Sequence, residues 1–535
     1  MDARVPPSAN ASPPGVQPMP RCSFATAALL LLLSPHPPGQ AASSGFDPAE
    51  QDIRMLQLAM ARGETTSEAL VMAYLARIEA FDGQGPELNA IAVLNPQAKT
   101  DARSLDEERA ANGPRGPLHG IPILIKDNYL TRGMPTSVGS RLLRAYQPDA
   151  EAELVTRLRA AGAVILGKTN MHEFAYGIES VGSAFGVTRN PYDPTRHPGG
   201  SSGGTGAAVA ASFAAVGMGS DTCGSIRDPA VHNALVGLRG TQGASSRTGI
   251  VPLSSTQDIG GPLARSVTDL AFVLDATVGF DSNDPQTAAS VGQLPASFLD
   301  ALHPGALRGT RIGWVRELIR IDPEDEVMAL IFDAAMEDLR ALGATVIEVS
   351  VPHLDELVFE RIDGFYVLVY EFGRDLDAFL ATYPGAPVTA LEEIIASDTA
   401  HPAVQPLLLE SAALSEEERP VYLEELVKRD RLRTVLEQVM AEARLDALAY
   451  PTIRRQASLL GSLQEGNNCH LSANAGLPAI TVPAGFTPDG LPAGLELLGR
   501  AWSDAALLGY AYDYEQATRH RSPPPLTPLA DTGTE

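Results

Sequence analysis

The amino-acid sequence predicts one α/β domain in which helices cover both faces of a mixed central β-sheet. Short apolar segments alternate with helical patterns along most of the chain, which is typical of this fold class. The apolar segments have the composition of strands that are buried on both faces. With 44% hydrophobic and only 20% charged residues, the chain can bury a large core. Length alone would favour about three domains, but the continuous alternation favours one.

The N-terminal segment has the order of a secretory signal. Arg21 precedes the apolar run Phe24–Leu33, and the small-residue stretch GQAASS follows. The apolar run is too short to span a bilayer. We therefore expect a signal peptide over residues 1–41 and a periplasmic or secreted mature protein. The start of the chain is left open between Met1 and Met19, and a disordered tail with a chance leucine run is the alternative.

Helix and strand patterns follow one another in the next part of the chain. Apolar residues recur at helical spacing between residues 70 and 78, which predicts an amphipathic helix. Residues 90–94 have the pattern of a strand, and a polar helix over about 96–112 follows. The apolar run Ile121–Ile125 then predicts a buried strand with Lys126 at its end.

Two serines lie in glycine-dense loops, Ser201 in the first and Ser225 in the second. The small apolar residues 207–216 between them predict a buried helix, which could return both loops to one place. Glycine permits close approach of the backbone, so the N–H groups of such loops can converge on an anion. A flexible Gly/Ser linker is the alternative, but linkers are usually polar and residues 207–216 are not.

A serine hydroxyl becomes an effective nucleophile when a base takes its proton. Lys126 is a candidate for that base. Burial at the end of an apolar strand would lower the lysine pKa and leave a neutral amine. The alternative is a lysine at a solvent-facing strand end, which is common.

The spacing of these three residues resembles that of the amidase signature family. Lys126 and Ser201 are 75 residues apart, and Ser201 and Ser225 are 24 apart. The segments GKTNMHEFA, DIGGPLARSVTDLA and GLPAITVPAG are also similar to the family's, and the likeness extends from about residue 46 to 516. The resemblance implies a Ser-Ser-Lys triad in which Ser225 is the nucleophile and Lys126 the base. Ser201 would bridge them and follow a cis peptide bond.

The resemblance also implies an oxyanion hole formed by main-chain N–H groups of Thr222, Cys223, Gly224 and Ser225. Cys223 departs from the family, which has glycine or alanine at this position. Because a thiol is small, we expect function to survive.

Three further side chains could support the second glycine-dense loop. Asp221 and Arg227 flank Ser225 and could pair, while Ser202 could hydrogen-bond across the loop. The alternative is that they serve only the folding of the loop.

The second half of the chain continues the alternation of helices and strands. Its patterns predict a helix over 325–342, a strand over 344–349, a long charged helix over about 420–444, two further strands after 446 and a closing helix over 503–518. We expect an amidase domain over residues 42–525. Within it, a variable region at about 300–420 would shape the substrate pocket, and residues 526–535 would form a C-terminal tail.

Two motifs favour other functions. Gly162–Thr169, GAVILGKT, fits the phosphate-loop pattern, but residues 163–166 have a buried-strand sequence, whereas phosphate binding needs a loop of exposed N–H groups. Gly199–Gly203 fits the GxSxG pattern of α/β-hydrolases, with Ser201 as the nucleophile. That pattern needs a strand directly before the loop, and residues 190–200 are instead rich in proline and turn residues.

Metal ligands and disulfide scaffolds are not indicated. His172 and Glu173 have no ligand cluster beside them in the sequence, so we expect no metal and no organic cofactor. Beyond the expected signal peptide only Cys223 and Cys469 remain, too few for a disulfide-built scaffold. The sequence leaves their pairing open.

Taken together, the residues and the resemblance predict hydrolysis of a carboxylic amide to an acid and ammonia or an amine. The net charge of −25 argues against nucleic acid or anionic lipid as a partner. An amidotransferase A-type subunit is one alternative, which the expected export signal disfavours. A non-catalytic binding protein on the same scaffold is another, which the intact triad disfavours. The substrate could be a peptide amide, an aryl amide or a fatty amide, and the oligomeric state is left open.

Overall fold

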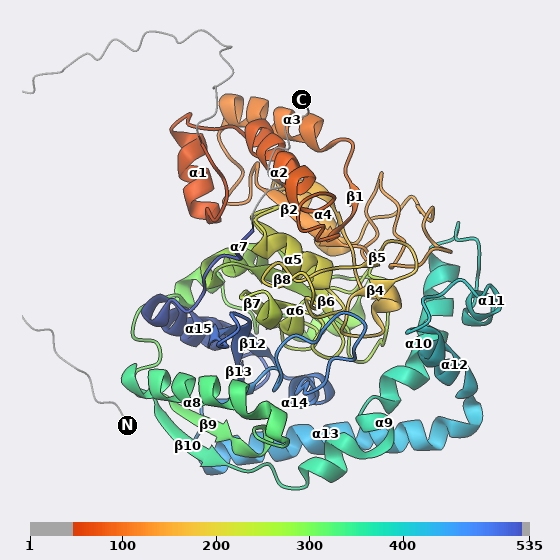
Figure 1. The fold of residues 1–535 in the computed structure, drawn as a ribbon, viewed down its shortest axis with the longest axis vertical. Helices are drawn as coiled ribbons and strands as arrows, with labels where there is room; N and C mark the ends of the chain where they lie inside the picture. The colour runs from red at the N-terminus through yellow and green to blue at the C-terminus, as the bar shows by residue number, and fades with distance from the viewer. Residues whose placement is uncertain (1–45, 527–535) are drawn as a thin grey trace, which may run out of the picture. The chain divides into compact units, whose positions relative to one another are not determined.

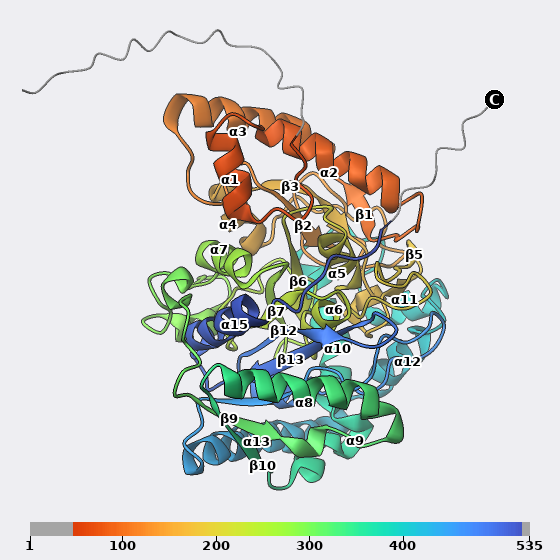
Figure 2. The same cartoon turned by 60° about the vertical axis from the view of Figure 1, so that its left-hand side comes forward.

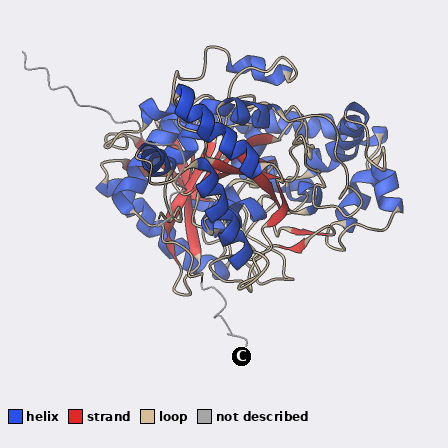
Figure 3. Ribbon diagram, turned by 90° about the horizontal axis from the view of Figure 1, so that it is seen from above, coloured by secondary structure: helices blue, strands red, loops and turns tan. Residues whose placement is uncertain are grey.

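An 11-stranded mixed sheet runs through residues 46–526, the part of the chain that the computed structural model describes. The expected signal peptide over residues 1–41 lies outside this part, as does the expected tail apart from Leu526. The described residues belong to one unit, and helices cover the sheet on both sides (Figure 3). The predicted fold class, a single α/β domain with a mixed sheet covered on both faces, is confirmed.

The strands of the sheet lie in the order β1-β3-β2-β6-β8-β7-β12-β13-β11-β9-β10. Their bounds are β1 (Ile91–Leu94), β2 (Pro122–Lys126), β3 (Val164–Thr169), β6 (Val216–Asp221), β7 (Val236–Arg239), β8 (Ile259–Ala264), β9 (Arg311–Val315), β10 (Thr345–Val349), β11 (Ala447–Pro451), β12 (Ala479–Phe486) and β13 (Pro492–Leu498). A separate antiparallel pair is formed by β4 (Val181–Gly182) and β5 (Gly186–Val187).

The helices connect these strands and cover the sheet (Figures 1 and 2). Their bounds are α1 (Ile53–Ala61), α2 (Ser67–Phe81), α3 (Ala98–Asn112), α4 (Glu153–Ala160), α5 (Gly203–Ala210), α6 (Arg227–His232), α7 (Val267–Thr277), α8 (Glu326–Ala341), α9 (Glu360–Asp363), α10 (Tyr366–Thr382), α11 (Leu391–Ala396), α12 (Gln405–Ala413), α13 (Arg419–Glu442), α14 (His470–Ala475) and α15 (Asp504–Thr518). Helices α5 and α6 pack on one face of the sheet, and α7, α15 and α8 on the other.

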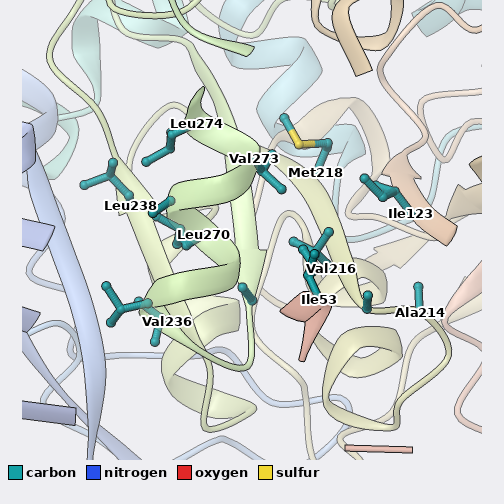
Figure 4. Packing of buried hydrophobic residues seen from close by; sticks show 14 of the residues in the cluster. Ile53, Ile123, Ala214, Val216, Met218, Val236, Leu238, Leu270, Val273 and Leu274 are labelled. Carbon is teal, nitrogen blue, oxygen red and sulfur yellow. The ribbon is translucent and has the colours of Figure 1, made fainter. Parts of the chain in front are cut away.

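The alternation of side chains along β6 explains why its two faces differ. Val216 and Met218 point into the main hydrophobic core, which also holds side chains of β7 and α7 (Figure 4). Gly217 and Gly219 lie on the opposite face: a Cβ atom at Gly217 would collide with side chains of α5, and one at Gly219 with Leu263 and with Ser202, which precedes α5. Glycine at these two positions therefore lets α5 lie close against the strand.

This strand corrects the expectation for residues 207–216. The predicted buried helix exists, but it is α5, which begins at Gly203 and ends at Ala210. Residue 216 instead begins β6, which runs to Asp221. The chain therefore turns between the first glycine-dense loop and the second by a helix followed by a strand.

Most of the phosphate-loop pattern at 162–169 is a strand, as its apolar residues predict. Strand β3 covers Val164–Thr169, including the second glycine and the lysine of the pattern, and each of its residues is buried. Lys168 lies 3.1 Å from Asp127 inside the protein. Its ammonium group is therefore engaged in an internal ion pair.

The sheet order brings the ends of two chain segments together. Strands β2 and β6 are adjacent and parallel, so their carboxyl ends lie at the same edge of the sheet. Lys126 is the last residue of β2, and Asp221 is the last residue of β6. The side chain of Lys126 and the loop that follows Asp221 therefore lie close to each other.

Among the described residues, the structure has no helix long and apolar enough to cross a membrane.

Candidate active site

Lys126 and Ser201 are in direct contact at the centre of the site. The Lys126 Nζ atom lies 2.7 Å from the Ser201 Oγ atom, and both residues have no exposed surface. Ser201 follows a cis peptide bond with Gly200 and stands just before helix α5. The cis peptide bond that the resemblance implied is therefore present.

Ser225 lies in the loop after β6, beside Ser201. The N–H of Ser202 donates to the carbonyl oxygen of Ser225 over 3.2 Å, which joins the two glycine-dense loops. Ser225 is 3% exposed and lines a large cavity, whereas Ser201 and Lys126 do not line it. A molecule in the cavity can therefore reach Ser225, whereas Ser201 and Lys126 are not exposed to the cavity.

Burial changes the protonation of Lys126. It lowers the pKa of the Lys126 amine to about 7, although the negative charges of Asp258 and Asp221 act in the opposite direction. A large part of the amine is then neutral near neutral pH, as a base requires.

Ser220 is a contact of Lys126 that the sequence analysis missed. Its Oγ atom lies 2.9 Å from Lys126 Nζ, and its carbonyl oxygen lies 3.3 Å away. The Asn128 side chain donates to the same Oγ atom over 3.0 Å. The only signal in the sequence is that Ser220 and Asn128 lie near the predicted site residues.

The main-chain N–H groups of the loop after β6 are not equivalent. The N–H of Gly224 donates to Asp221 Oδ1 over 2.9 Å. Within the described residues, the N–H groups of Cys223 and Ser225 have no protein acceptor. The Thr222 side chain donates to Asp258 over 2.5 Å, which fixes the start of the loop. The loop therefore presents free N–H groups beside the Ser225 hydroxyl.

A buried ion network supports this loop. Asp221 pairs with Arg227 over 3.1 Å, as the sequence predicted, and also with Arg239 over 3.0 Å. Arg227 makes a further pair with Glu496 over 2.5 Å, and none of these side chains is exposed. Burial alone would raise the Asp221 pKa, but the charges of Arg227 and Arg239 hold it below its ordinary value. Arg239 and Glu496 were not predicted, because both lie far from the loop in sequence.

Ser202, the third of the expected supporting residues, contacts strand β6. Its Oγ atom donates to the carbonyl oxygen of Ser220 over 3.3 Å. The bond therefore ends inside the strand, on the residue that also contacts Lys126, and not in the loop that follows.

Cys223 and Cys469 form a disulfide bond, which the sequence left open. Their Cα atoms are 5.1 Å apart, and the bond connects the loop after β6 to the residue just before α14. His470 is the next residue, and its Nδ1 atom lies 3.7 Å from Cys223 Sγ. Although these three side chains form a compact group of potential metal ligands, the two sulfur atoms are bonded to each other and are not available as thiolates.

The cavity in front of Ser225 has a volume of about 970 Å³. Much of its wall is apolar, including Phe359, Ile362, Phe365, Leu368, Val369, Leu407 and Leu463. Most of these residues come from the region at 300–420 that we expected to be variable. Charged side chains in the wall are already engaged by the protein: Arg454 by Asp325, Glu465 by Arg455, and Glu179 by main-chain N–H groups.

The alternative GxSxG interpretation finds no partner for Ser201. In the part of the chain that the structure describes, no histidine ring is hydrogen-bonded to Ser201 or Ser225. The contact partner of Ser201 is Lys126. The geometry therefore favours a lysine-based site.

Comparison with protein families and solved structures gives a consistent result. The sequence model of the family described as Amidase matches residues 69–508. The structure is similar to the X-ray structure of native peptide amidase from Stenotrophomonas maltophilia, with a TM-score of 0.83 and 40% identity. That match covers 90% of this chain and 99% of the other.

Curated relatives carry the name of the A-type subunit of glutamyl-tRNA(Gln) amidotransferase. The one from Moorella thermoacetica is 38% identical over 87% of this chain and 96% of its own length. One from Synechococcus is 36% identical over 89% and 93%. The expected periplasmic or secreted location is contradicted by these relatives, which are named as a subunit of glutamyl-tRNA(Gln) amidotransferase. The prediction of export is therefore wrong.

Proposed function

The chain belongs to the amidase family, and we propose that it hydrolyses a carboxylic amide through an acyl-enzyme on Ser225. The observation that carries this proposal is the order of the three side chains. Ser225 lines the cavity, its loop is joined to the Ser201 loop by the bond from the Ser202 N–H to the Ser225 carbonyl oxygen, and Ser201 is hydrogen-bonded to a buried lysine whose pKa is lowered to about 7. This order suits proton transfer from the nucleophile to the base through Ser201.

In the first half of the reaction, Ser225 Oγ attacks the amide carbonyl carbon and loses its proton to Ser201. Ser201 passes its own proton to neutral Lys126, which becomes an ammonium group. The tetrahedral intermediate collapses as the C–N bond breaks, and the leaving nitrogen takes the proton back through Ser201. Water then attacks the acyl-enzyme by the same route and releases the acid.

The negative oxygen of the intermediate needs hydrogen-bond donors beside Ser225. The N–H groups of Cys223 and Ser225 are free to serve, since neither has a protein acceptor among the described residues. Thr222 and Gly224 complete the set that we propose, although the Gly224 N–H would share its bond with Asp221. Removing one such donor typically lowers kcat by about 100- to 1000-fold.

For the substrate, we infer an amide with a bulky apolar acyl group, and the C-terminal amide of a peptide is the candidate that we favour. The size and apolar wall of the cavity support this inference. So does the 40% identity with a solved peptide amidase. Because the charged wall residues are engaged elsewhere, a zwitterion such as free glutamine would find few polar partners here.

A second candidate is the A-type subunit of an amidotransferase, which would release ammonia from an amide for transfer within a complex. Curated relatives with 36% and 38% identity over most of the chain carry that name. In this role the chain would need further protein partners, and nucleic acid would enter as a substrate of the complex.

Ammonia release by the isolated chain separates the two candidates. We would measure it with an N-blocked dipeptide amide that has an apolar C-terminal residue and with glutamine, using Ser225→Ala as the control. Peptide amide hydrolysis that Ser225→Ala abolishes supports our main proposal. The second candidate replaces it if glutamine is turned over and the peptide amide is not, and if this turnover requires the other proteins of such a complex.

A further inference from the structure

The Cys223–Cys469 bond lies in the loop whose main-chain N–H groups we propose as oxyanion donors. Cys223 is two residues before Ser225, and its main-chain N–H is one of the free donors among the described residues. Cys469 precedes α14 and follows the segment 461–467, which lines the cavity. A single covalent bond therefore connects the oxyanion loop, residues 222–225, to a cavity wall 246 residues further along the chain.

The two cysteines differ in access. Cys223 is 6% exposed and lines the cavity, whereas Cys469 has no exposed surface and does not line it. A small molecule that enters the cavity can therefore contact Cys223, while Cys469 is shielded. The route to the bond is the same route that the amide substrate uses.

His470 gives the reduced form of Cys223 a hydrogen-bond partner. Its Nδ1 atom lies 3.7 Å from Cys223 Sγ, and its ring packs against Phe365 and Phe359 with centroid distances of 4.7 and 5.6 Å. Burial lowers the His470 pKa to about 4, so the ring is neutral near pH 7. Nδ1 of the neutral ring can accept the thiol proton of Cys223 in a weak hydrogen bond.

We propose that the Cys223–Cys469 bond is a redox-sensitive modification site, which small dithiols reach through the amide cavity and which sets the rate of amide hydrolysis. A thiolate of the dithiol attacks Cys223 Sγ, and Cys469 leaves as a thiolate that takes a proton from water. The second thiol of the reagent then displaces the Cys223 sulfur. The reagent ends as a cyclic disulfide, and the two cysteines gain two electrons and two protons.

Reduction loosens the oxyanion loop without freeing it. Besides the contact of His470 with Cys223, two hydrogen bonds still join the segment at 467–470 to this part of the chain. Arg227 donates to the carbonyl oxygen of Cys469 over 3.5 Å, and Asn467 donates to Asp228 over 2.8 Å. We therefore expect kcat to fall about three- to tenfold, less than the loss of a whole oxyanion donor would cause. KM should change less than about twofold, since the wall contacts of the substrate persist.

The sequence has one further cysteine, Cys22. The test uses the full chain with Cys22→Ser, so that the thiol count reports only on the Cys223–Cys469 bond. The count should rise from zero to two on treatment with dithiothreitol, together with the fall in kcat, and reoxidation should restore both. Cys469→Ala should have the lower kcat from the start and should not respond to the reagent. Protein whose Ser225 carries a fluorophosphonate adduct should be reduced more slowly, because the adduct occupies the cavity.

Three outcomes would overturn the proposal: two free thiols in the purified protein, an unchanged kcat after complete reduction, or a reduction rate that the adduct does not affect. The proposal rests on the proposed function, since amide hydrolysis is its readout. If the oxidised protein hydrolyses no amide, the proposed function fails. If the oxidised protein is active but its kcat does not change on reduction, only the redox proposal is contradicted.

Discussion

Lys126 Nζ lies 2.7 Å from Ser201 Oγ while two oxygen atoms of Ser220, Oγ and the carbonyl, lie 2.9 and 3.3 Å from the same nitrogen. A neutral amine has two N–H bonds and one lone pair. If the two oxygen atoms of Ser220 accept the N–H bonds, the lone pair is left for the Ser201 hydroxyl proton. The contacts of Lys126 therefore fit a base that is neutral and oriented toward Ser201.

The pH dependence of kcat/KM should report the ionisation of Lys126. Because the base works only when deprotonated and its pKa is lowered to about 7, kcat/KM should rise with pH through about 7 and level off above it. Lys126→Ala should lose at least about 100-fold, and its remaining activity should lack this ionisation. Lys126→Arg is the matched control, since it keeps a long basic side chain but stays protonated and so cannot act as the base. A wild-type ionisation that persists in Lys126→Ala would assign it to another group.

The same ionisation should appear in protein stability. The folded pKa of Lys126 is about 7, below the value of about 10.4 for an unfolded lysine. Between these values the unfolded chain binds a proton that the folded chain does not, so the free energy of unfolding rises with pH. Relative to Lys126→Met, the wild type should gain about 1.4 kcal/mol per pH unit between about pH 7.5 and 9. Urea unfolding of both proteins tests this, and a difference independent of pH would show that the lysine is not buried as described.

Ser220 should act as a positioning residue for Lys126. Without its hydroxyl, the amine loses one acceptor and Asn128 loses its own. Ser220→Ala should lower kcat by about 10- to 100-fold, part of the total effect of a general base, with little change in KM. Ser220→Thr keeps the hydroxyl and should retain most activity. Equal effects of the two substitutions on kcat, with no change in the pH profile, would indicate only a packing role.

Asp221 should be essential for the stability of the loop after β6. Asp221→Asn leaves Arg227 and Arg239 buried with an incomplete set of charge partners, and removing one partner of a buried pair typically costs about 3–5 kcal/mol. Because the Asp221 pKa is lowered, its stabilising effect is present above the unfolded value and is lost as the pH falls through the folded one. Urea unfolding at pH 7 measures the loss, with Glu68→Gln as the control because its partner Arg103 is largely exposed. Equal losses in the two variants would contradict this account.

How well the sequence predicted the fold depended on composition. Strand β2 was predicted because an uninterrupted apolar run of that length is typical of a buried strand and short for a helix. Strand β6 was not predicted, since its sequence VGMGSD alternates with glycines that are poor strand formers. Those glycines are required by the close approach of α5, which only the folded structure reveals.

The site was predicted in the same uneven way. Lys126, Ser201 and Ser225 were found through their spacing and the family resemblance, and the structure brings Lys126 and Ser201 into contact. Glu496 was missed because it reaches Arg227 from β13, a strand that joins the sheet late in the chain. The pairing of Cys223 with Cys469 was left open for the same reason, since 246 residues separate the two cysteines. Such contacts follow from the order of strands in the sheet, which local patterns do not encode.

Mass spectrometry after reaction with a fluorophosphonate tests the central claim most directly, because the reagent marks the serine that a base activates. We predict one adduct per chain, on the peptide that carries Ser225, with labelling abolished in Ser225→Ala and strongly slowed in Lys126→Ala. An adduct on Ser201 that persists in Ser225→Ala, or no adduct in a protein that hydrolyses amides, would contradict the proposed order of nucleophile, bridging serine and base.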